Sequence, residues 1–514
     1  MTHTARSMPA PDAGALAVGT AAAVAVTGLV LVGPTSTGAF LAIAVVLLAL
    51  TAFSAWRWPR ATLVIAALTT LLDPVVAPRL APPGVTLDVI GISEPLLAAA
   101  GIVVFVGAAR RGGLRLALGD PTAPLVLALV GLSVISAMVN RTPPDVAAFG
   151  ILMTIDAIAA YFLWRMLPTT VRSASLAAAA IVAGAVLVAL VGIGQVLLDP
   201  ALFGFLSQEA WGKIRPITSI VGNPNMVAMV LAFVAPFPVF GAIRLPTRRH
   251  RWLSAAAAFI ILLGIALTFS RGGWAAAAVG LGVGTLLLDR RALLLAVALS
   301  AMAWGSVLLM PVGLLTADTV APDTVASEAP TPDPDPSPSS PQPVPSPSDA
   351  GTSDALRGMG SNEVRLFLLR DGLRIVDDHL FVGVGPGRYG GAAAAIYPSP
   401  VYAEYDTTLG HLRTVHNFWL HLVGEVGALG LTIFLGILAA LGIRFWLSAR
   451  TASGPRFVVL AGCAAAVIVV AVHNVTEMSL EGNVPGILIW LTLGIGSTLA
   501  HASLRPEQHR RADD

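Results

Sequence analysis

Charged residues are scarce in this chain. Asp, Glu, Lys and Arg make up 12% of its 514 residues, whereas hydrophobic residues make up 56%. A soluble protein of this length needs a larger charged surface, so the composition excludes that class. Apolar runs of about 20 residues recur, and a run of this length can cross a bilayer as a helix. The sequence therefore predicts an all-α polytopic membrane protein.

Cysteine and lysine each occur once, as Cys463 and Lys213. One cysteine excludes an intrachain disulfide and a cysteine metal cluster. Positive charge is carried almost entirely by arginine, which is typical of a GC-rich genome. Asp333 and Asp335 have the D-x-D spacing of metal-dependent sugar transferases, but they lie in a flexible spacer. We therefore expect no metal and no other cofactor.

The apolar runs predict 12 to 14 transmembrane helices, because the short third run could be broken or re-entrant. The runs lie at 15–33, 37–55, 60–73, 89–109, 121–140, 147–165, 173–198, 225–243, 253–270, 273–289, 292–314, 417–443, 457–473 and 484–502. Arginine is concentrated in the short loops on one side, which the positive-inside rule assigns to the cytoplasm. Both termini are therefore expected inside, with residues 315–416 outside.

These boundaries give the predicted organisation of the chain. It comprises a cytoplasmic tail (1–14), eleven transmembrane helices (15–314), a Pro/Ser/Asp-rich linker (315–354), an ordered outer loop (355–415), three further transmembrane helices (416–502) and a second tail (503–514). The linker has polyproline character and is expected to be a disordered tether. The outer loop is expected to carry short helices, with Val364, Phe367, Leu368 and Ile375 forming an apolar face.

A minority of cations fall on the predicted outer side, against the prevailing bias. They gather at Lys213 and Arg215, at Arg271, and in the outer loop. Such a surface favours an anionic ligand that approaches from outside. The alternative is that some of these side chains extend to lipid phosphates.

Three motifs on this side carry polar groups suited to chemistry. In GNPN, Asn223 fits a helix cap and Pro224 a first turn, while Asn223 and Asn225 could also meet phosphate or sugar hydroxyls. In TFSRGG, Arg271 can bind phosphate oxygens in bidentate fashion or anchor the interface. His416 and Asn417 open an apolar helix, whose dipole disfavours an imidazolium and suits a neutral base. His411 and His421 are the competing histidines.

The segment GVGPGRYGG matches a dinucleotide-binding fingerprint only as a string, because no βαβ unit surrounds it. We interpret it as a tight turn. Glu425 lies inside the following apolar run, and its depth makes it a functional candidate. The alternative is that it has a structural role and braces its helix.

Taken together, the motifs resemble the O-antigen ligase/polymerase superfamily over roughly residues 200–445. The matching pieces, in the family's order, are GNPN (222–225), TFSRGG (268–273), Arg365 in SNEVRLFLLRDGL, GVGPGRYG (383–390) and HNFWLHLVGEVGALGL (416–431). Two features depart from the family pattern: His379 where proline is frequent, and the Pro-rich spacer. Both leave the proposed chemistry untouched.

The resemblance implies a metal-independent, inverting glycosyltransferase of GT-C type in the bacterial cytoplasmic membrane. Its donor would be a polyprenyl-diphosphate-linked glycan, and its acceptor a glycan, lipid or cell-wall hydroxyl on the outer face, with no nucleic acid partner. It implies that His416 is the base and that Arg365 and Arg271 hold the diphosphate. Arg215 is a further candidate for binding the diphosphate. The candidates for lining the substrate site are Asn223, Asn225, Asn417, Arg370 and Arg388.

Ligases and polymerases share these motifs, so the choice between them stays open. A high-GC bacterium without an outer membrane would favour a polymerase or a cell-wall ligase. A transporter or flippase of lipid-linked saccharides is the alternative class, but it predicts charges deep in several helices and an internal repeat. A non-catalytic scaffold predicts that residues 355–416 tolerate substitution.

Overall fold

The computed structural model describes residues 37–74, 93–198, 216–311 together with Leu314, 361–390, 416–480 and 485–503. Every regular element within these ranges is helical, which confirms the all-α polytopic prediction. The helices are α2 (Thr37–Arg57), α3 (Pro59–Thr69), α5 (Ser93–Ala109), α6 (Gly113–Leu118), α7 (Ala123–Val139), α8 (Pro144–Arg165), α9 (Val171–Leu197), α10 (Pro224–Val234), α11 (Pro236–Arg244), α12 (Arg248–Leu267), α13 (Arg271–Leu288), α14 (Arg290–Leu308), α17 (Ser361–Asp378), α19 (Phe418–Arg450), α20 (Gly454–His473) and α21 (Gly486–Ser503).

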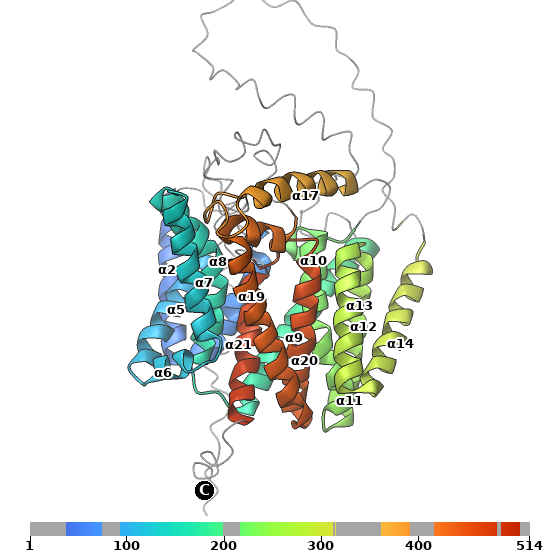
Figure 1. Ribbon diagram of the computed structural model, residues 1–514. Coiled ribbons are helices and arrows are strands. Elements are labelled where there is room, and N and C mark those ends of the chain that lie inside the picture. Colours follow the sequence, from blue (N-terminus) through green and yellow to red (C-terminus); the bar gives the residue numbers. More distant parts are fainter. Residues whose placement is uncertain are drawn as a thin grey trace, which may run out of the picture.

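The long helices stand side by side in one bundle, and α17 lies across one end of it (Figure 1). We call this the α17 end. Among the described residues, eight helices are long and apolar enough to span a membrane, with α10 and α11 counted as one, and shorter apolar helices accompany them. Each predicted apolar run in the described part coincides with a helix, whereas run 15–33 lies outside it. The short third run ends in a 3-10 turn at Thr70–Leu72.

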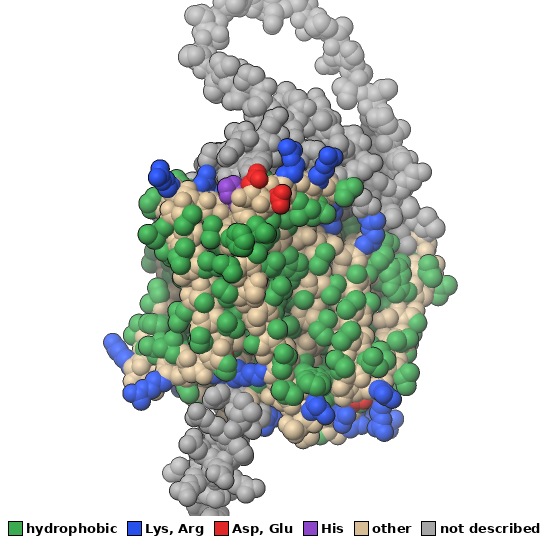
Figure 2. Space-filling view, viewed as in Figure 1, with side chains coloured by type: hydrophobic (Ala, Val, Ile, Leu, Met, Phe, Trp, Pro, Cys, Tyr) green, Lys and Arg blue, Asp and Glu red, His purple; other side chains and the backbone are tan. Residues whose placement is uncertain are grey.

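The side wall of the bundle is hydrophobic, and charged side chains gather at its two ends (Figure 2). Leu294 and Leu308 on α14 are 73% and 81% exposed, and Leu309, directly after the helix, is 87% exposed. Burying such side chains in lipid removes apolar area from water, which stabilises the inserted protein. This arrangement supports a multi-pass membrane protein; which end faces the cytoplasm stays a prediction.

The centre of the bundle is formed by α10–α11 and α20, the most buried of the spans. Small residues allow α13 and α20 to approach closely here. A Cβ atom built on Gly284 would stand 2.5 Å from the Cβ of Ala465, so only glycine fits. Close contact between small residues is a common source of helix association in membranes, where the hydrophobic effect gives little. The α20 helix is thereby fixed against α13.

Helix α19 is broken at Gly427, which has φ 73° and ψ −179°. The loop after α17 fills the break. Val384 and Gly385 donate backbone hydrogen bonds to the carbonyls of Gly424 and Glu425, and Ala428 donates to the carbonyl of Leu380. Non-helical backbone at membrane depth is tolerated where protein groups satisfy it in this way. The break in α19 is therefore stabilised by hydrogen bonds from the loop after α17.

The glycine-rich segment is a tight turn, as the sequence analysis predicted. Gly383, Gly385, Gly387 and Gly390 all have positive φ. The backbone N–H of Gly387 donates to Oε1 of Glu425 at 2.7 Å. The Glu425 carboxylate is consequently occupied inside the protein, where it braces the turn against α19.

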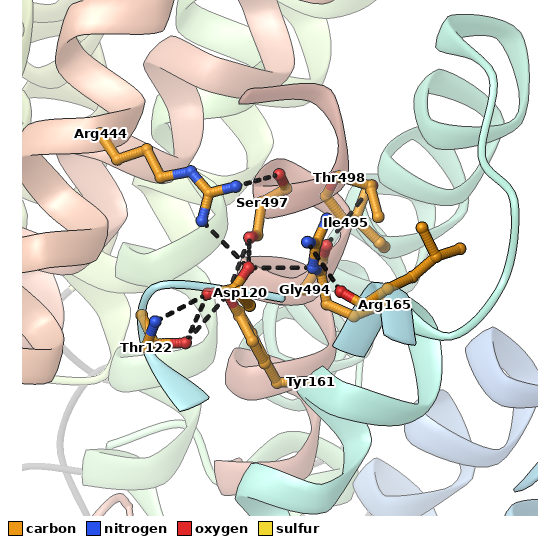
Figure 3. A network of polar contacts seen from close by, with 10 residues as sticks. Asp120, Thr122, Tyr161, Arg165, Arg444, Gly494, Ile495, Ser497 and Thr498 are labelled. Carbon is orange, nitrogen blue, oxygen red and sulfur yellow. Dashed lines mark hydrogen bonds and ion pairs between the residues drawn. The ribbon is translucent and has the colours of Figure 1, made fainter. Parts of the chain in front are cut away.

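The opposite end of the bundle is held by a buried polar network centred on Asp120 (Figure 3). Arg165 Nε and Arg444 Nη1 lie 2.9 and 3.0 Å from Asp120 Oδ2. Ser497 Oγ donates to the same oxygen at 2.8 Å, and Thr122 donates to Oδ1 through both its amide and its hydroxyl. Burial by itself would raise the pKa of Asp120, but the two guanidinium groups and Thr122 hold that pKa well below its usual range. The carboxylate thus joins α7, α8, α19 and α21.

Candidate active site

Three helices begin close together at the α17 end, and each carries a side-chain cap. Asn223 caps α10, Ser270 caps α13 and Asn417 caps α19, each through a side-chain oxygen that accepts an amide of the first turn. The capping role predicted for Asn223 is confirmed, with Pro224 in the first turn. Helix N-termini present partial positive charge, so their convergence favours an anion.

A single carboxylate, that of Glu477, lies where these helix starts meet. Its Oε1 accepts a hydrogen bond of 2.6 Å from Asn225 Nδ2 and one of 2.9 Å from Arg365 Nη2. Its Oε2 lies 3.5 Å from His416 Nδ1. The Glu477 side chain is 5% exposed, so a nearly buried anion connects three residues that lie far apart in the chain.

The periodicity of α17 explains why Arg365 reaches this carboxylate. Leu368, Ile375 and Val376 of the same helix are buried against the bundle, which confirms the predicted apolar face for Leu368 and Ile375. Arg365 precedes Leu368 by three residues and therefore points the same way. Val364 and Phe367 belong to the predicted face too, but their side chains lie outside the described residues.

His416 directly precedes the cap of α19 and has φ 48°. A non-glycine residue with positive φ is uncommon, and such residues gather at functional sites. This backbone directs the ring back toward Glu477 while the side chain stays 39% exposed. His416 therefore has one side toward a buried carboxylate and another toward the outside of the bundle.

Arg271 borders the same cluster. It is the first residue of α13, directly after Ser270, whose hydroxyl donates to Asn225 Oδ1 at 2.7 Å. The next residue, Gly272, lies so close to Thr476 that a side chain there would overlap the Thr476 hydroxyl. Arg271 is exposed, so its guanidinium can meet a ligand that arrives over Glu477.

The other predicted site residues, except Asn225, form no hydrogen bond or ion pair with Glu477 in the described part of the chain. Asn223 and Asn417 use their side-chain oxygens as caps, and Arg370 is on the exposed face of α17. Arg388 donates to the carbonyl of Asn140 at 3.0 Å, so it fastens the glycine turn to α7. Arg215 lies outside the described residues.

The competing histidine His421 is not in this cluster. His421 is buried one turn into α19, with Nε2 3.6 Å from Oε2 of Glu425 and its ring near Tyr389. His411 lies outside the described residues. In the described part of the chain, His416 is thus the histidine that lies at the helix start beside Arg365.

Glu477 was not among the predicted site residues. A signal was present, because HNVTEMSLEGN (473–483) is the short polar stretch between the last two apolar runs, on the same predicted side as the unusual arginines. Buried His473, with Nδ1 3.0 Å from Ser479 Oγ, was missed with it. Buried charges in membrane proteins are paired, so the arginines that were predicted to lie outside needed an acid on their own side.

Cationic groups, amides and helix starts therefore surround Glu477 at the α17 end. Such a set can bind phosphate oxygens and place a histidine next to them. The described residues include no group of three or more His, Cys, Asp or Glu side chains arranged to hold a metal ion.

Residues 256–435 match the model of a family described as O-antigen ligase. The chain contains an O-antigen ligase domain. This finding confirms the family resemblance seen in the motifs. The O-antigen ligase match includes Arg271, Arg365, His416 and the glycine turn, whereas Asn225 and Glu477 lie outside it. A search of the curated proteins found no match.

The O-antigen ligase domain and the flanking helices thus share one site. Arg365 and His416 belong to the matched segment. The Glu477 carboxylate that contacts both lies between α20 and α21, and Asn225 of α10 donates to that carboxylate. The family supports a membrane glycosyl-transferring role for the chain.

Proposed function

We propose that this protein transfers a glycan from a polyprenyl diphosphate to an acceptor hydroxyl on the outer face of the bacterial cytoplasmic membrane. The observation that carries the proposal is the meeting of Arg365 and His416 over Glu477, where three helix N-termini converge. The family match supports the glycosyl-transferring class. The identity of the donor, the side of the membrane on which the acceptor lies, and the mechanism go beyond the family match and are parts of this proposal.

The leaving group in this reaction is a diphosphate, which gains negative charge as the sugar departs. Arg365 and Arg271 approach the site from different elements, α17 and α13, so they can bind different phosphate oxygens. The first turns of α10, α13 and α19 add partial positive charge. Groups placed in advance around the developing charge stabilise the transition state without reorganisation.

The acceptor hydroxyl has to lose its proton as it attacks the anomeric carbon. We assign this role to His416, because it is partly exposed and lies at the end of the bundle where Arg365 is held. Attack on the face opposite the diphosphate would invert the anomeric configuration. The C–O bond to the diphosphate breaks as the bond to the acceptor oxygen forms.

The experiment uses full-length protein in detergent or proteoliposomes, a polyprenyl-diphosphate glycan and candidate acceptors. We expect His416→Ala and Arg365→Ala to abolish transfer while the variants still express and fold. Arg374→Ala is the matched control, because Arg374 is an exposed arginine of the same helix. Full activity in either site variant would contradict the role assigned to that residue.

Two further arms of the same assay sharpen the proposal. Transfer that survives a chelator is expected for a metal-independent reaction, whereas loss of transfer would contradict metal independence. A single product indicates a ligase, and a ladder of repeat units indicates a polymerase.

A further inference from the structure

We propose that Glu477 is a positioning residue that orients the diphosphate-binding arginine and the base together. The inference rests on the proposed function and adds to it a residue outside the O-antigen ligase match. One carboxylate oxygen serves Arg365 and the other faces His416, so a single side chain sets the geometry of both halves of the reaction.

The Oε1 side fixes Arg365. The contact uses Nη2 of the guanidinium, which carries five N–H donors, so the other donors remain for phosphate oxygens. Asn225 Nδ2 donates to the same oxygen, and Ser270 fixes the Asn225 amide from its other end. Glu477 therefore cannot swing toward solvent without losing two hydrogen bonds.

The Oε2 side faces Nδ1 of His416. A carboxylate at Nδ1 favours the tautomer with its proton on Nδ1, which leaves Nε2 as the nitrogen that accepts a proton. The same carboxylate stabilises the imidazolium that forms when the acceptor proton arrives. At 3.5 Å the contact is at the long limit for a hydrogen bond, and such contacts commonly tighten when substrate binds.

The proton balance of the step is simple. The acceptor O–H proton passes to Nε2 of His416, the acceptor oxygen bonds to the anomeric carbon, and the polyprenyl diphosphate leaves with the electron pair of the broken C–O bond. Glu477 keeps its charge throughout, and no co-reactant is needed.

The backbone around Glu477 is held without its side chain. The amide of Phe418 donates to the carbonyls of Asn474 and Glu477, and the amide of Ser479 donates to Asn474 Oδ1. A change confined to the carboxylate should therefore leave this segment folded. The charged and titratable groups around it are Arg365 on α17, His416 before α19 and His473 on α20, with Arg271 nearby on α13.

The test compares Glu477→Gln and Glu477→Asp in the full-length protein, with a polyprenyl-diphosphate glycan as donor and steady-state kinetics over a range of pH. We expect Glu477→Gln to lower kcat by about 100-fold or more, because general-base catalysis contributes on this scale. The acid side of its kcat profile should move to lower pH, since the imidazolium has lost its carboxylate. Glu477→Asp should restore part of kcat. Asp378→Asn, an exposed carboxylate on α17, is the matched control.

The outcomes separate the inference from the function it rests on. Wild-type kcat and an unmoved acid limb in Glu477→Gln, together with an inactive His416→Ala, would overturn the role of Glu477 alone. An active His416→Ala would overturn the assigned base and this inference with it. An inactive but unfolded Glu477→Gln would show a structural role only, and thiol labelling of the buried Cys463 reports that state.

Discussion

Ser270 donates a hydrogen bond of 2.7 Å to Oδ1 of Asn225, and this contact joins the first turns of α13 and α10. The same Asn225 amide donates through Nδ2 to Glu477. Each end of the amide is thus matched to its partner: an acceptor faces the hydroxyl and a donor faces the carboxylate. Asn225 is 8% exposed, so water has little access to replace either hydrogen bond when one is lost.

Asn225→Asp should therefore be more harmful than Asn225→Ala. Aspartate would place a second negative charge beside Glu477, whereas alanine only removes the two hydrogen bonds. Leaving a buried polar partner unsatisfied costs about 1–3 kcal/mol. Thermal unfolding in detergent and the transfer assay would measure both variants; equal behaviour would contradict the charge argument.

Gly427→Ala should destabilise the upper part of α19. Its φ is positive, and a Cβ atom would overlap the carbonyl of Phe381. A strained φ costs about 1–3 kcal/mol before the overlap is counted. The matched control is Gly436→Ala on the same helix, where a Cβ atom meets nothing within 4 Å.

The thiol of Cys463, the only cysteine in the chain, provides the measurement for this pair. It is buried, so it should react with a thiol dye only when the bundle opens. We expect faster labelling in Gly427→Ala and wild-type labelling in Gly436→Ala. Equal rates in the two variants would show that the break in α19 does not require glycine.

Asp120→Asn should destabilise the bundle by about 3–5 kcal/mol, because it leaves Arg165 and Arg444 buried without their counter-charge. Since the pKa of Asp120 is lowered on folding, its contribution is fully present above the unfolded value of about 3.9 and is lost as pH falls through the folded value. Unfolding temperatures of wild type and Asp120→Asn should therefore differ by a constant amount between about pH 5 and 8. A difference that already shrinks over this range would contradict the lowered pKa.

The predicted orientation places the α17 end outside. The cysteine introduced by Arg374→Cys on α17 should react with a membrane-impermeant thiol reagent in intact cells. A cysteine at Arg249→Cys, exposed at the opposite end near the start of α12, should react only after permeabilisation. The reverse pattern would place the site on the cytoplasmic side and exclude the proposed donor.

The helices could be predicted because they depend on local pattern, whereas the roles of the site residues stay predictions. Apolar length locates the spans, and the dipeptide Asn223-Pro224 marks a helix start whatever surrounds it. Arg365 and His416 stood out as cations and helix-start groups on one predicted side. Glu477 did not, because its role comes from partners 112 and 252 residues away, Arg365 and Asn225.

Arg388 shows the opposite case. It was a candidate for lining the substrate site, and its hydrogen bond to the carbonyl of Asn140 could not be predicted, because it depends on the conformation of the glycine turn. Arg370 was a candidate of the same kind, and it lies on the exposed side of α17, five residues along the helix and therefore on a different face from Arg365. The contact of Arg388 depends on the glycine turn, and the position of Arg370 depends on the rotation of α17 about its axis. The composition and the motifs reveal neither of these.

The break at Gly427 divides α19 into two lengths with different attachments. The length before the break is bonded to the loop that follows α17 through Gly424 and Glu425, and its first residue, Phe418, is bonded to Glu477. The length after the break runs on to Arg444 and its partner Asp120. Glu477 is itself bonded to Asn225 of α10, so the start of α19 is held to the centre of the bundle. A shift of the length after Gly427 would thus leave His416 beside Glu477 and Arg365.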